Sequence, residues 1–322
     1  LKPTVECETH PRTMDSEVLA LSSDLMATAS GFCLTTEQRA LLPPSLEILK
    51  IENKFSRVVF WGKLQGKMGD YLIAQGLGEA ASMDAKVAGG EVVVAEYFET
   101  LKTIPKKTYR LSPDGVGWTR LPTVDEGVKT KVAEFDTFVR GSGKVFEPLM
   151  GDAAHVFKFT VTVPPAEEGG EATTDERELA EDERLAAMVA EIDEATSVVP
   201  SGAYVLTASQ QIVANSYYRG LPLSDGLSIR SYLHMRSPHD TTNEAATMEQ
   251  SAMVKARDFL DSVAGDTPKG SWSLKHDSPN NLIILRSLLY PGYIHFNMVD
   301  SPLYGSAYVG TGLKNFTLAF ML

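Results

Sequence analysis

Two glycine-rich segments of this 322-residue chain are the first candidates for phosphate chemistry. Gly141-Ser142-Gly143-Lys144 resembles the end of a loop whose backbone N–H groups and lysine hold phosphates. That loop also needs a glycine five positions before its second glycine and a Ser or Thr after the lysine, where Phe138 and Val145 stand. Gly310-Thr311-Gly312 would need a third glycine at Asn315 to match a dinucleotide fingerprint. We therefore expect a flexible turn at the first segment and no dinucleotide site at the second.

The histidines and cysteines do not form a recognisable catalytic or metal motif. None of the six histidines, at positions 10, 155, 234, 239, 276 and 295, belongs to an HExxH pattern or stands beside a pair of cysteines. Cys7 and Cys33 are too few for a disulfide framework, so we expect reduced thiols. We predict no catalytic residue, metal or cofactor. A dispersed Ser, His and Asp triad stays open as an alternative, because one sequence does not show which side chains meet.

Large aromatic side chains gather in the segments that have strand-like patterns. We predict a protein interface at Trp61, Tyr71, Trp272 and Tyr290, because amphipathic rings are enriched at such surfaces. The alternative is that these rings fill the core. Burial of the four side chains in a single chain would contradict the interface.

The charge of the chain is unevenly distributed. The 42 Asp and Glu residues outnumber the 30 Lys and Arg residues, for a net charge of −12, and Glu167 to Glu194 holds 12 acidic against 2 basic residues. This sign argues against a nucleic-acid partner, whose phosphates bind cations. The acidic segment is either a solvated helix face or a surface for salt-sensitive contacts. No run of about 18 apolar residues and no secretory signal is present, so we expect an intracellular protein that does not span a membrane.

The elements that must position these residues alternate between helices and strands. Apolar spacing predicts a helix from Ser16 to Gly31 and a second helix, capped by Thr35 or Thr36, that breaks at Pro43-Pro44. Strand-forming residues and glycine predict a β-hairpin over Arg57–Gln75. A turn is expected at 113–115 and a half-buried strand at 156–163.

Helices and strands are also expected in the second half of the chain. Apolar spacing predicts a helix from about Asp175, capped by Thr173 and Glu176, after a loop that starts at Pro164. A further helix is expected from 242 or 243 to 264. Turn signals separate short strands at 203–208, 211–215, 271–275, 282–287, 293–298 and 306–309, the last four forming an antiparallel meander. The predicted class is α+β, with N-terminal helices, a hairpin, two later helices and a C-terminal meander.

Several ordered segments resemble the radial spoke head protein 9 family. They are Arg57–Lys63, Asp70–Leu77, Gly220–Ser224 with Ser231-Tyr232, Pro268–Ser273, Leu285–Gly292, Tyr304–Asn315 and Phe320–Leu322. The start of the family pattern aligns with Met14, so residues 1–13 are expected to be an extension, and 14–322 a radial spoke head domain with an acidic loop and helix at 164–196. Segments 78–131 and 151–171 are longer than the family pattern.

The resemblance implies a function in motile cilia and flagella. It implies a structural, non-catalytic subunit of the axonemal radial spoke head that assembles with homologues of radial spoke head proteins 4 and 6. It also implies transient contact with the central-pair projections and a part in relaying signals to the dynein arms. The alternative is a soluble cytosolic enzyme or adaptor with a dispersed site.

Overall fold

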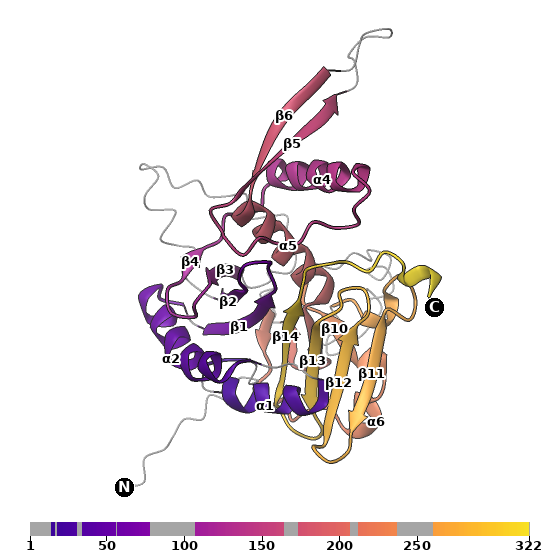
Figure 1. Cartoon of the computed structure of the whole chain (residues 1–322). Helices are drawn as coiled ribbons and strands as arrows, with labels where there is room; N and C mark the ends of the chain where they lie inside the picture. The colour runs from indigo at the N-terminus through magenta and orange to yellow at the C-terminus, as the bar shows by residue number, and fades with distance from the viewer. Residues whose placement is uncertain are drawn as a thin grey trace.

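One eight-stranded sheet organises the chain. The computed structural model describes residues 14–16, 18–30, 34–55, 57–77, 107–163, 173–206, 212–236 and 260–321. The strand order is β11-β12-β13-β14-β1-β2-β3-β4 (Figure 1). The strands are β1 (Arg57–Leu64), β2 (Tyr71–Leu77), β3 (Lys107–Ser112), β4 (Thr119–Arg120), β11 (Trp272–Asp277), β12 (Leu282–Ser287), β13 (Tyr293–Met298) and β14 (Tyr304–Gly310). The predicted hairpin, meander and α+β class are confirmed.

A parallel pair of strands, β1 and β14, joins the hairpin to the meander, although the two strands lie far apart in the sequence. Strand β14 lies beside β1 with Gly62 opposite Tyr308. The remaining neighbours in the sheet are antiparallel. A Cβ atom at Gly62 would lie 2.2 Å from the Tyr308 carbonyl oxygen, so the close approach of these strands requires glycine there.

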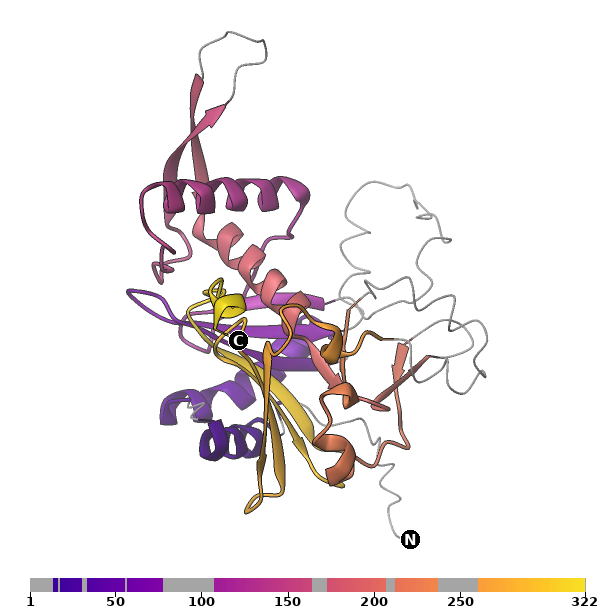
Figure 2. The same ribbon diagram turned by 90° about the vertical axis from the view of Figure 1, so that its right-hand side faces the viewer.

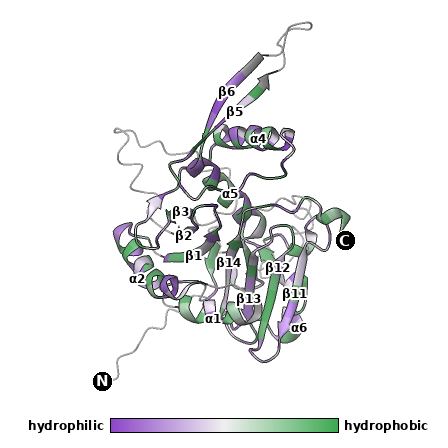
Figure 3. Cartoon of the chain, in the orientation of Figure 1, coloured by the Kyte–Doolittle hydropathy of each residue, from purple (hydrophilic) through white to green (hydrophobic). Residues whose placement is uncertain are grey.

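Helices cover both faces of this sheet, as the two views in Figures 1 and 2 show. On one face, α1 (Leu19–Ser30) and α2 (Thr36–Glu52) pack against strand residues such as Phe60, α1 through Leu19 and α2 through Leu42. On the other face, α5 (Glu181–Thr196) packs Leu185 and Val189 against a second set of strand residues, which includes Ile73, Ile283 and Leu285. Because alternate strand residues point to opposite faces, the central strands are apolar on both sides, and β12 has a mostly hydrophobic colour in Figure 3.

Helix α2 corrects the predicted break at Pro43-Pro44. The helix runs through both prolines and ends at Glu52. Its start is as predicted, because Thr35 and Gln38 form a capping box with two bonds of 3.2 Å. Each internal proline removes one backbone hydrogen bond. Burial of the flanking leucines, Leu42 and Leu46, offsets that cost, so tertiary packing overrides local propensity.

The helix predicted from Asp175 begins six residues later. Thr173–Ala180 is strand β6, which pairs along its whole length with β5 (Val156–Val163), so Thr173 and Glu176 do not cap a helix. The prediction for β5 is confirmed, with Phe159 buried between exposed Lys158 and Thr160. Residues 164–172 of the acidic loop lie outside the described residues. Pairing with β5 selects the extended form of a segment whose own pattern fits a helix.

A projecting hairpin and one helix form a unit that we call the arm, made of α4 (Glu126–Gly141), β5 and β6. Both views show the hairpin extending away from the sheet (Figures 1 and 2), and β6 has a mostly hydrophilic colour in Figure 3. The arm has its own small core of Phe135, Val139, Phe159 and Leu179. The Gly141–Lys144 segment is the turn that ends α4, as predicted, with Gly143 at φ +83°.

Short elements complete the fold beside the meander. They are β7 (Val198–Pro200) paired with β10 (Tyr232–His234), β8 (Tyr204–Leu206) paired with β9 (Ile212–Ala214), α6 (Leu223–Gly226), and the 3-10 turns η1 (Ile229–Ser231), η2 (Val263–Gly265) and η3 (Leu318–Phe320). The predicted strands at 203–208 and 211–215 are confirmed as β8 and β9. Most of the helix predicted from 242 or 243 to 264 lies outside the described residues, and its last positions form η2 instead. Residues 1–13 also lie outside them, whereas Met14 is buried.

Candidate interaction site

The four aromatic residues predicted to form an interface are buried in the single chain. Trp61 and Trp272 are 8 % exposed, and Tyr71 and Tyr290 are 1 % exposed. All four belong to the core between the sheet and α5. The prediction that their rings supply exposed contact area is therefore wrong. Interface and core favour the same amphipathic ring types, and here the core uses them.

Three of these rings donate hydrogen bonds to carboxylates on α5. Tyr71 Oη lies 3.3 Å from Glu181 Oε1, and Trp61 Nε1 lies 3.2 Å from Asp193 Oδ1. Tyr290 Oη lies 2.6 Å from Glu191 Oε1. Each buried ring thus keeps a partner for its polar atom, which removes the penalty of burying that atom unpaired.

The acidic residues of α5 therefore stabilise the fold. The sequence analysis considered a solvated helix face for this segment and did not predict such contacts with the core. Glu181 is buried and also accepts the Met150 N–H at 2.7 Å. Burial raises the pKa of Glu181, while that hydrogen bond and the charge of Arg184 act to lower it. Asp193 forms an ion pair with Lys107, and Glu191 with Lys314 at 3.0 Å. Helix α5 uses these acids to connect the sheet to the segments around it.

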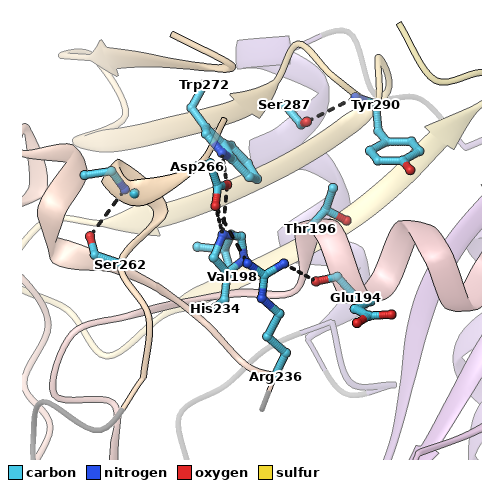
Figure 4. A network of polar contacts seen from close by, with 12 residues as sticks. Glu194, Thr196, Val198, His234, Arg236, Ser262, Asp266, Trp272, Ser287 and Tyr290 are labelled. Carbon is cyan, nitrogen blue, oxygen red and sulfur yellow. Dashed lines mark hydrogen bonds and ion pairs between the residues drawn. The ribbon is translucent and has the colours of Figure 1, made fainter. Parts of the chain in front are cut away.

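The fourth ring belongs to a network around Asp266 (Figure 4). Trp272 Nε1 donates to Asp266 Oδ2 at 2.7 Å, and His234 Nε2 lies 3.0 and 2.9 Å from the two carboxylate oxygens. Arg236 lies 3.8 Å from Oδ1 and also donates to the Glu194 carbonyl at 3.1 Å. Burial acts to raise the pKa of Asp266, but the contacts with His234, Trp272 and Arg236 lower it overall. The network ties β10, β11 and α5 together.

This His and Asp pair has a structural geometry and not that of a hydrolytic triad. The His234 side chain is completely buried, and its Nδ1 atom has no hydrogen-bond partner among the residues that the structure describes. A triad needs a serine hydroxyl at the free imidazole nitrogen. In the described ranges, no group of three His, Cys, Asp or Glu residues could hold a metal ion. Within the same ranges, no helix is both long and apolar enough to cross a bilayer.

A groove of about 470 Å³ lies between α4, α5 and the segment that follows β14, and we call it the α4–α5 groove. Its lining is Val124, Lys129, Val132, Ala133, Asp136, Arg140, Val145, Phe146, Arg184, Ala187, Met188, Ala190, Glu191, Glu194, Gly312, Leu313, Lys314 and Phe316. Two of its apolar side chains face solvent, because Val145 is 72 % and Phe316 is 52 % exposed. Exposed apolar surface beside a concavity is typical of sites where another molecule binds.

Arg184 and Asp136 place opposite charges in this groove. The Arg184 guanidinium is buried among Phe135, Phe146 and Phe157, with its carbon 5.0 to 5.3 Å from the ring centres. It donates to the Glu147 carbonyl, and its Nη1 atom has no hydrogen-bond partner within the described ranges. Burial raises the pKa of Asp136, although the Arg184 charge acts to lower it. Charged residues of both signs share the lining with apolar ones, and the charge of Arg140 acts on Asp136 in the same direction as that of Arg184.

Sequence interpretation missed this groove because it missed α4. The apolar residues Val128, Val132, Phe135 and Val139 follow one another at spacings of four, three and four, which is the pattern of a helix face. That signal could have identified α4. Nothing in the pattern shows that this helix packs beside α5, because the contact joins elements about fifty residues apart in the chain.

Comparisons with known proteins identify the family. No family model matches the chain. Radial spoke head protein 9 homologs from Danio rerio and Mus musculus are 37 % identical over 311 residues and 35 % identical over 312 residues. The Homo sapiens homolog is 33 % identical over 311 residues. Each alignment covers 96 % of this chain and 100 % of the relative. The chain belongs to the radial spoke head protein 9 family.

Proposed function

We propose that the chain is a structural, non-catalytic subunit of the radial spoke head in the axoneme of motile cilia or flagella. The observation that carries this proposal is the similarity to radial spoke head protein 9 homologs over their whole length. The segments quoted for the family resemblance include β1, β2 and β14, which lie at the centre of the sheet. We propose residues 14–322 as one spoke head domain, with 1–13 as an extension to it.

The polar chemistry of the core supports a structural function. The carboxylates of Glu181, Asp193 and Asp266 bind aromatic rings and cations of the same chain. Catalytic carboxylates and histidines must instead reach a substrate. Buried groups that are paired in this way hold a rigid shape, which is what a subunit of a mechanical assembly needs.

We further propose that this subunit assembles with homologues of radial spoke head proteins 4 and 6 and takes part in relaying central-pair signals to the dynein arms. The arm supports a function in contacts, because its hairpin projects from the sheet (Figure 1). Asp175, Glu176 and Glu178 on β6 are exposed. Lys158 on β5 pairs with Glu178 at 2.9 Å, so this surface carries charges of both signs. Exposed charges make transient contacts sensitive to ionic strength, so we propose that this surface adjusts contacts with the central pair.

Co-expression tests the assembly directly. The chain is co-expressed with a radial spoke head protein 4 homologue from the same organism, and the mixture is analysed by size-exclusion chromatography with light scattering at low and moderate salt. We expect one peak that contains both chains at a defined mass. A monodisperse lone chain at both salt concentrations would overturn the direct pairing.

A further inference from the structure

We propose that the chain binds a cluster of water molecules as structural ligands in a cavity between β1, β14 and β7, where they bond to His295 and Asn297 of β13. The inference goes beyond the proposed function, because it assigns an internal binding site and not a partner. Three observations carry it: buried polar atoms that lack partners, a cavity beside them, and the neutral chemistry of those atoms.

Strand β13 directs two polar side chains towards the face of the sheet that α5 covers. His295 and Asn297 share this face with Tyr293, which belongs to the core under α5, because alternate residues of a strand point the same way. Both polar side chains are completely buried. The two ring nitrogens of His295 and the two amide atoms of Asn297 have no hydrogen-bond partner among the described residues. Buried polar atoms are nearly always bonded to protein or to water, since leaving them unpaired costs free energy.

A cavity of about 110 Å³ lies against the same part of the sheet, and its lining includes Tyr293, Tyr304 and Ser306. Ser306 stands opposite His295 in the β13–β14 pair. Tyr304 stands opposite Asn297, and its ring centre lies 6.1 Å from that of His295. The two polar side chains of β13 are therefore neighbours of the cavity wall. The cavity has room for several water molecules, each of which takes up about 30 Å³ in the liquid.

The charged residues of the cavity lining already have partners in the chain. These residues are Arg57, Lys107 and Asp193. Arg57 lies 2.7 Å from Asp15, and Lys107 forms its ion pair with Asp193. The lining therefore presents no unpaired charge among the described residues that would select an ion, and a ligand of neutral chemistry is favoured.

The unpaired atoms need a ligand that both donates and accepts hydrogen bonds. Burial lowers the pKa of His295 to about 3, so the ring is neutral near pH 7 and offers one donor and one acceptor. The Asn297 amide also offers donors and an acceptor. Water meets both needs, and typical small-molecule sites are several times larger than this cavity. Water molecules that bridge such groups would connect β13 to β14 and β7 in the manner of direct hydrogen bonds.

A high-resolution crystal structure of the wild-type chain tests the site without any substitution. We expect ordered water molecules about 2.7 to 3.2 Å from the His295 ring nitrogens and the Asn297 amide atoms. A cavity that holds no ordered water would overturn the inference. An ion or an organic molecule at this position would also overturn it, as would protein groups that bond to all four atoms directly.

Oxygen-17 magnetic relaxation dispersion counts long-lived internal water molecules in solution and allows matched variants to be compared. Asn297→Leu removes two of the unpaired atoms, and Tyr304→Phe removes a hydroxyl group from the cavity wall. The control is Tyr232→Phe, because the Tyr232 hydroxyl donates to the Gly226 carbonyl at 2.9 Å and has its partner in the chain. Thermal unfolding shows whether each variant is folded.

We expect Asn297→Leu and Tyr304→Phe each to lose at least one internal water molecule relative to wild type, and the control to lose none. If Asn297→Leu does not fold, Tyr304→Phe and the wild-type structure still decide the question. Equal counts in wild type, the control and every folded cavity variant would overturn the inference. The proposed function does not depend on this result, since co-elution with the partner is measured separately.

Discussion

Two regions of the molecule differ in how much apolar surface the fold covers. One is the sheet packed with α1, α2 and α5, and the other is the α4–α5 groove. In the sheet, four large aromatic rings are buried and each has a carboxylate partner in the same chain. In the groove, Val145 and Phe316 are exposed, and Asp136 shares the lining with Arg140 and Arg184, whose charges act on it. The sheet is complete as a folded unit, whereas apolar surface of the groove stays in contact with solvent. Substitutions in the two regions should therefore differ in how much stability they cost.

The largest effect is expected from Trp61, whose ring packs against Tyr109 and Tyr308. Trp61→Ala leaves a cavity and removes one of the two partners of Asp193 described above, so the free energy of unfolding should fall by about 4 kcal/mol. Urea denaturation measures this change. The matched variant Phe316→Ala, on the groove rim, should change it by less than about 0.5 kcal/mol. Equal losses from the two variants would contradict the comparison.

A smaller loss of about 3 kcal/mol is expected from Asp266→Asn, which leaves the buried His234 without its charged partner. The pKa of Asp266 is lowered in the folded state, so its contribution is present above the unfolded value near pH 3.9 and is lost as the pH falls through the folded value. Urea denaturation across pH 3 to 7 should show the gap between wild type and variant shrinking below about pH 4. A gap that stays constant with pH would show that the Asp266 charge does not stabilise the fold.

His295 should make the sheet sensitive to mild acid. Burial lowers its pKa to about 3, so it stays neutral in the folded state while the unfolded chain takes up a proton below about pH 6.5. The contribution of His295 to the free energy of unfolding is therefore complete above about pH 6.5. As the pH falls from there towards 3, the free energy of unfolding decreases by about 1.4 kcal/mol per pH unit. Wild type should lose about 2 kcal/mol more than His295→Leu between pH 6.5 and pH 5, as measured by urea denaturation. Parallel curves for the two proteins would contradict a buried neutral imidazole.

The smallest change in stability, below about 0.5 kcal/mol, is expected for Phe316→Ser, because the ring is half-exposed. Urea denaturation of the variant beside wild type measures this change. A loss as large as that of Trp61→Ala would place Phe316 with the core residues.

The sequence predicts the sheet better than it predicts the groove, for physical reasons. Strands β12 and β13 are flanked by turn residues and have consistent strand patterns, so local signals suffice for them. Segment 173–180 carries a capping-box pattern, Thr173 followed by Glu176, but it is a strand that pairs with β5. The α4–α5 groove depends on the packing of two helices that no local pattern places side by side. For Trp61 and Tyr71, residue type is equally suited to a core or an interface, and only the fold decides.

Hydrogen–deuterium exchange of this chain, alone and in complex with the radial spoke head protein 4 homologue, tests the central claim most directly. We predict that the amides of β12 and β13 are already protected in the chain alone and that the partner leaves their exchange unchanged. Failure to form a complex, or strands that become protected only in the complex, would contradict the account of a self-contained sheet in an assembly subunit.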